Sequence, residues 1–87
     1  MSLETSPDVL AAHLSGEAVL LNLNDKSYYR LNETAAIVWA ALEKGESREQ
    51  ILSSLTTQYD VAADEAERDM NRVIDDMKSR NLIFEKN

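Results

Sequence analysis

Hydrophobic and polar residues alternate in the first third of the chain and recur at helical spacing in the remainder. Val19, Leu21 and Leu23 lie on one face of an extended segment, because successive side chains of a strand point to opposite faces. Turn residues at Asn24-Asp25 and at His13–Gly16 separate the extended segments from one another. This pattern predicts an antiparallel meander of three strands over about residues 8–14, 18–23 and 26–31.

Three amphipathic helices are expected after the strands, over about residues 33–44, 48–58 and 63–80. Asn32 is a favourable N-cap for the first helix, and Gly45 suits the position after its end. Ser47 with Gln50 three residues later forms a capping box that begins the second helix. Asn81 tolerates the left-handed turn that ends the third. The apolar stripe of this third helix comprises Ala66, Met70, Val73, Ile74 and Met77.

The length and composition predict one small α+β domain over residues 1–87. The chain has no cysteine, which excludes disulfides and thiolate metal sites. No apolar run approaches the roughly 18 residues that a membrane span requires. The start of the chain has neither the basic nor the apolar region of a secretory signal. We therefore expect a cytoplasmic protein that does not enter a membrane.

The charge of the chain argues against nucleic acid as a ligand. Sixteen Asp and Glu residues against nine Lys and Arg residues give a formal net charge of -7. Proteins gain affinity for phosphate backbones mainly from clustered cations. The acids concentrate in the last third of the chain, where they are expected to form a solvated helix face.

No group of residues in the sequence points to catalysis, to a metal site or to a cofactor. His13 is the single histidine and has no partner residue arranged around it, so it is expected to be an ordinary surface or turn residue. Asp75 and Asp76 are adjacent on a helix and point about 100° apart, which does not suit a carboxylate pair. Trp39 lies on the apolar stripe of the first helix and is expected in the core. The sequence predicts a protein that is not an enzyme.

The third strand is the candidate for function. Alternation places Tyr29 with Leu31 on the inward face and Tyr28 with Arg30 on the other face. An unpaired strand edge can accept an extended peptide. The same strand can also be an ordinary edge that its charged residues protect from aggregation, and the residues alone leave both interpretations open.

Short motifs occur in a fixed order along nearly the whole chain. In order they are Gly16-Glu17, Val19-Leu20-Leu21, Tyr28-Tyr29-x-Leu31-Asn32, Thr34-Ala35, Trp39, Tyr59, Asp69 and Asn81-Leu82-Ile83. Their combination resembles the PqqD-like family, which comprises small winged helix-turn-helix-like domains also called RiPP recognition elements. Members bind the leader peptides of ribosomally made peptides and present them to modifying enzymes. Asn81 stands where the family often has Gly.

The resemblance implies where a leader peptide binds. The peptide would add as an antiparallel strand beside the third strand and pack against the third helix. The implied strand residues are Lys26, Ser27, Tyr28, Tyr29, Arg30 and Leu31. The implied helix residues are Asp69, Arg72, Val73, Asp76, Met77 and Arg80.

The resemblance also implies partners: a precursor leader peptide and a separate maturation enzyme, with no metal or cofactor. That enzyme would be a leader peptidase in lasso-peptide biosynthesis or a radical enzyme in PQQ biosynthesis. The chain is expected to be of the lasso type, since it ends soon after the last predicted helix.

Two other classes of protein share some of these features. A winged-helix DNA-binding regulator has a similar helix order but needs a basic recognition helix, whereas the predicted third helix holds six acids and four cations. An acyl or peptidyl carrier protein has similar size and acidity, but its modified serine stands at the start of a helix. Ser53-Ser54-Leu55 lies inside the second predicted helix.

Overall fold

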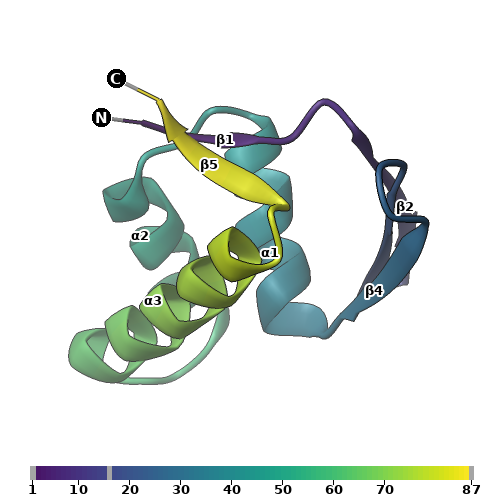
Figure 1. Ribbon diagram of the computed structural model, residues 1–87. Coiled ribbons are helices and arrows are strands. Elements are labelled where there is room, and N and C mark those ends of the chain that lie inside the picture. Colours follow the sequence, from purple (N-terminus) through teal and green to yellow (C-terminus); the bar gives the residue numbers. More distant parts are fainter. Residues whose placement is uncertain (1, 16, 87) are drawn as a thin grey trace.

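A three-stranded antiparallel sheet stands beside a group of three helices in the computed structural model, which describes residues 2–15 and 17–86 (Figure 1). The meander and the helices confirm the predicted α+β, winged helix-turn-helix-like fold class. The elements are β1 (Ser2–Thr5), β2 (Val9–Leu14), β3 (Glu17–Asn22), β4 (Ser27–Leu31), α1 (Glu33–Glu43), α2 (Arg48–Gln58), α3 (Ala63–Ser79) and β5 (Ile83–Lys86).

The expected element limits and the observed ones differ by a residue at several ends. The strand expected over 18–23 is β3, which ends at Asn22, and Leu23 lies in the turn that follows. Lys44 and Arg80 are C-caps of α1 and α3 rather than the last helical residues. Of the turn expected at His13–Gly16, Gly16 lies outside the described residues.

The structure also contains a second sheet, which the sequence did not predict. In it the two ends of the chain pair as β1 and β5 (Figure 1). The strands are antiparallel, with Thr5 opposite Ile83, and the Ser6 N–H donates to the Leu82 carbonyl at 2.9 Å. Such a pairing has no local turn signal, because its partners stand at opposite ends of the sequence. The structure therefore adds a two-stranded sheet to the predicted three-stranded one.

The three-stranded sheet has the order β2-β3-β4, so β3 is central and β4 is an edge. Ala18 and Leu20 on β3 are fully buried, whereas Val19 and Leu21 are only half-buried. The helices therefore cover the face opposite to the one on which the sequence gathers Val19, Leu21 and Leu23.

The ends of the helices follow the side chains that the sequence places there. The Asn32 side chain accepts a hydrogen bond from the Ala35 N–H at 2.9 Å, and Ser47 and Gln50 form the reciprocal capping box. Gly45 and Asn81 both have positive φ, at 76° and 60°, as the left-handed turns after α1 and α3 require. Side-chain caps thus mark the starts of α1 and α2, whereas the N-cap of α3, Ala62, makes no side-chain hydrogen bond.

The core lies between α1, α2, α3 and the inner face of the sheet. Trp39 of α1 is 1% exposed, as expected for a core residue. The buried residues of α3 are Ala66, Met70, Ile74 and Met77, and Val73 is half-buried on their flank. No helix among residues 2–15 and 17–86 combines the length and the apolar character that crossing a membrane requires.

Truncating the buried stripe of α3 should destabilise the domain severely. We expect Ile74→Ala and Met70→Ala each to lower the free energy of unfolding by about 2–5 kcal/mol, through lost apolar burial and the cavity left behind. Asp75→Ala, at an exposed position of the same helix, should change it by no more than about 0.5 kcal/mol. Urea denaturation followed by circular dichroism measures all three, and equal effects in Ile74→Ala and Asp75→Ala would contradict this assignment of the core.

Candidate functional site

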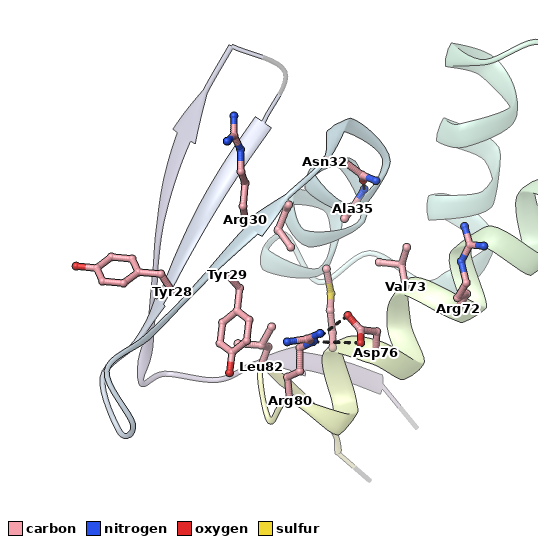
Figure 2. A pocket seen from close by; sticks show the side chains of 12 residues that line it. Tyr28, Tyr29, Arg30, Asn32, Ala35, Arg72, Val73, Asp76, Arg80 and Leu82 are labelled. Atoms are coloured by element: carbon pink, nitrogen blue, oxygen red, sulfur yellow. Dashed lines mark hydrogen bonds and ion pairs between the residues drawn. The ribbon is translucent and has the colours of Figure 1, made fainter.

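A cleft of about 590 Å³ opens between β4 and the C-terminal half of α3 (Figure 2). Its wall on one side is the edge strand of the sheet, and its wall on the other is a helix face of apolar and charged residues. The lining residues are Tyr28, Tyr29, Arg30, Leu31, Asn32, Ala35, Arg72, Val73, Asp76, Met77, Arg80 and Leu82.

The two tyrosines of β4 point to opposite sides. Tyr29 projects toward α3 and lies near Leu82 and Arg80, whereas Tyr28 projects away from the helix (Figure 2). Tyr28 is 71% exposed. This is the alternation that the sequence predicts, with Tyr29 and Leu31 inward and Tyr28 outward.

The backbone of β4 offers hydrogen-bonding groups on its open edge. The Leu23 N–H donates to the Asp8 carbonyl at 2.8 Å, so residue 23 faces β2. Because the hydrogen-bonding direction alternates along an antiparallel strand, Asn22, Leu20 and Ala18 of β3 face β4. Their partners in the register are Ser27, Tyr29 and Leu31.

The remaining residues of β4, Tyr28 and Arg30, therefore direct their N–H and C=O groups away from β3. Within the described residues, no strand pairs with β4 on this side. The open edge thus presents two donors and two acceptors in the spacing of a β-ladder.

Helix α3 contributes an apolar floor and a column of charges. Met77 is buried and Val73 is half-buried, so both present hydrocarbon to the cleft. Arg72, Asp76 and Arg80 follow one another at a spacing of four residues, which places them along one side of the helix. The α3 wall therefore combines an apolar surface with charges of alternating sign.

Arg80 connects the helix wall to the strand wall. Its Nε donates to both carboxylate oxygens of Asp76 at 3.1 Å, and its guanidinium carbon lies 5.2 Å from the centre of the Tyr29 ring (Figure 2). The hydrogen bond that Arg80 donates to Asp76 raises the pKa of Arg80 above its ordinary value, and the carboxylate charge adds to this effect. Arg80 and Tyr29 thus close one end of the cleft.

Nine of the twelve residues that the sequence places at a binding site line this cleft. Lys26, Ser27 and Asp69 do not. Lys26 lies in the turn before β4 with a φ of 62°, Ser27 begins the strand, and Asp69 accepts a hydrogen bond from Arg72 at 3.2 Å. Their roles in binding, like those of the nine, stay predictions.

Three lining residues were missed in the sequence: Asn32, Ala35 and Leu82. The sequence indicates Asn32 as a helix cap and Ala35 only as part of a family motif, yet both residues follow shortly after the end of β4. Leu82 follows the end of α3, and no local pattern relates it to β4. Proximity to β4 in sequence could have indicated the first two residues, whereas Leu82 required the tertiary structure.

The chemistry available in the cleft is that of non-covalent recognition. It offers backbone donors and acceptors, apolar side chains and arginine guanidinium groups. Across residues 2–15 and 17–86, no three His, Asp or Glu side chains form a group that could hold a metal ion. His13 lies outside this cleft, with its Nε2 3.3 Å from Glu43.

Comparisons with known proteins point to one family. Residues 17–83 match the family described as coenzyme PQQ synthesis protein D (PqqD). The fold is similar to that of TbiB1 in complex with the TbiA(beta) leader peptide, with a TM-score of 0.90 and 27% sequence identity over 97% of this chain and 98% of that chain. It is also similar to lasso peptide synthetase B1 complexed with the leader peptide, with a TM-score of 0.88 and 27% identity over 98% of this chain and 100% of that chain. No curated protein matches the chain.

The ion pair in the cleft should contribute little to folding. We expect Asp76→Ala and Arg80→Ala each to change the free energy of unfolding by less than about 1 kcal/mol, because both side chains are about half-exposed. Met77→Ala, on the buried side of the same helix turn, should lower it by about 2–5 kcal/mol. Thermal denaturation compares the three variants. An Arg80→Ala protein as unstable as Met77→Ala would show that the pair holds the fold together.

Proposed function

The chain belongs to the PqqD family, and on this premise we propose that it is a non-catalytic recognition protein for the leader segment of a ribosomally synthesised precursor peptide. The peptide binds as an added antiparallel strand at β4. Two proteins of the same fold, nearly the same length and 27% identity are described as complexes with a leader peptide. Both lines of evidence favour the same class of ligand.

The observation that carries the proposal is the open edge of β4 beside the apolar floor of the cleft. The N–H and C=O groups of Tyr28 and Arg30 supply the ladder bonds that hold an extended peptide of any sequence. These main-chain bonds provide affinity and register. Selectivity then comes from the side chains of the peptide, every second of which points toward α3.

The apolar floor suits a hydrophobic side chain of the leader. Val73, Met77 and Leu82 line the cleft below the open edge. A side chain that enters from the added strand removes its own apolar surface and the exposed part of Val73 from water, which contributes about 25 cal/mol per Å² buried. The leader is therefore bound by a combination of strand pairing and pocket filling.

Delivery to a separate maturation enzyme completes the proposed role, and we favour a leader peptidase of the lasso type. One similar structure is described as lasso peptide synthetase B1. The cleft is built from β4, α3 and the residues next to them, so a bound leader leaves the β2 side of the sheet and the outer surface of α2 uncovered. An enzyme can contact these surfaces while the leader stays bound. We place this activity in the cytoplasm, where precursor peptides are translated.

Binding without turnover is the direct test of this proposal. Isothermal titration calorimetry with the leader encoded beside this chain should give an affinity between micromolar and nanomolar, about -8 to -12 kcal/mol. Addition of a chelator should not change it. Mass spectrometry of the recovered peptide should find it intact. Cleavage or modification of the leader by this chain alone would refute the non-catalytic role.

Proline substitutions on β4 test the binding edge. Tyr28→Pro removes an N–H that only an added strand uses, so the domain should stay folded while leader affinity falls tenfold or more, about 1.4 kcal/mol. Ser27→Pro removes an N–H that donates to the Asp25 side chain in the turn before β4, at 2.9 Å, and should lower the melting temperature.

Tyr28→Ala is the control for loss of the side chain, and it should bind the leader more tightly than Tyr28→Pro does. Fluorescence anisotropy with a labelled leader measures the affinities, and circular dichroism measures the melting temperatures. Normal binding by a folded Tyr28→Pro protein would show that the peptide does not bind at this edge.

A further inference from the structure

The charge of the cleft differs in sign from that of the whole chain. The chain has sixteen acids and nine cations, for a formal net charge of -7. The cleft lining contains three arginines, Arg30, Arg72 and Arg80, and one acid, Asp76. Three of the nine cations therefore line the cleft, whereas only one of the sixteen acids does.

All three arginines keep unused donor capacity. In the described part of the chain, each guanidinium donates through one nitrogen only: Arg30 to Glu17 at 3.0 Å, Arg72 to Asp69 at 3.2 Å and Arg80 to Asp76 at 3.1 Å. A guanidinium carries five N–H donors, which suit the two oxygens of a carboxylate. Exposed ion pairs of this kind contribute little energy and exchange easily with a ligand.

The arginines differ in how available they are to a peptide in the cleft. Arg80 is held by both oxygens of Asp76 and lies over the Tyr29 ring. Arg30 extends from β4 away from α3 (Figure 2). Arg72 is next to Val73 on the α3 wall, its side chain is 78% exposed, and its partner Asp69 does not line the cleft. Arg72 is therefore the guanidinium best placed to receive a group of the ligand.

Arg72 and Val73 are neighbours on the α3 wall of the cleft. Val73 is apolar and half-buried, whereas the Arg72 side chain is exposed. A peptide that packs an apolar side chain on Val73 therefore brings its neighbouring residues near the Arg72 guanidinium. The donors of this guanidinium can receive a carboxylate there.

We propose that the cleft selects peptides that carry an Asp or Glu close to the apolar side chain that packs on Val73, and that Arg72 receives this carboxylate. The inference rests on the proposed function, since it names the ligand of the same cleft. The net negative charge of the chain attracts cationic peptides at long range, but charges beyond about 8 Å are largely screened at physiological salt. Contacts within the cleft therefore decide the preference.

Selection from a library of displayed random peptides tests the inference without a known leader. Wild-type protein should enrich peptides with Asp or Glu at a fixed, short spacing from a large apolar residue. Arg72→Glu should enrich Lys or Arg at that position, and Arg72→Gln should show neither preference. Arg68→Glu is the matched control, because it makes the same charge change one turn earlier on α3, at an exposed position outside the cleft lining.

An enriched peptide then permits a charge swap in solution. Changing its acidic residue to Lys should weaken binding to the wild type by tenfold or more, and Arg72→Glu should recover most of the loss. The discrimination should decrease as salt is raised, because Arg72 is exposed.

Enrichment of apolar peptides with no acidic preference, or an unchanged preference in Arg72→Glu, would overturn the inference and leave the proposed function standing. Failure of the wild type to enrich any peptide, together with failure to bind the leader encoded beside it, would overturn both. Melting curves establish that each variant is folded.

Discussion

Helix α1 is the scaffold on which the rest of the structure depends. It packs against the sheet on one side and against α2 and α3 on the other, so β4 and α3 are held by a common support. Trp39, Val38 and Leu42 bury almost completely in these contacts. Since both pack on α1, β4 and α3 face each other across a cleft that opens to solvent. The candidate binding site is the space that this arrangement leaves.

An unpaired strand edge is a liability in most proteins, because it can pair with another chain. Here the edge borders a cleft with an apolar floor and an arginine-containing rim. A strand that adds to β4 must also fit its side chains against α3, so pairing depends on the side chains of the incoming peptide. In the proposed function, α3 therefore makes binding at this edge selective.

The core and the cleft lie on different sides of α3. Met70, Ile74 and Met77 face the core, whereas Arg72, Asp76 and Arg80 lie on the flank that lines the cleft. Exposed charges contribute little to the stability of a domain this small. The charged flank can therefore vary with the ligand while the buried stripe keeps the helix in place, and this separation suits a family of recognition domains.

The sequence by itself determined the local structure. Periodicity and capping residues predicted three strands of the meander and all three helices, and the family resemblance implied a binding role for Asp69, Arg72, Val73, Asp76, Met77 and Arg80 of α3, all of which except Asp69 line the cleft. Alternation on β4 likewise distinguished Tyr28 from Tyr29. These features depend on residues a few positions apart, so the pattern contains the necessary information.

Only the tertiary structure decided the relations between distant segments. It paired β1 with β5, buried the Ala18 and Leu20 face of β3, and directed the backbone of Tyr28 and Arg30 to the open edge. It also brought Leu82 into the cleft and Arg80 over Tyr29. Each of these depends on which surfaces α1 and the chain ends cover. No local pattern encodes them, because packing between distant residues is what selects them.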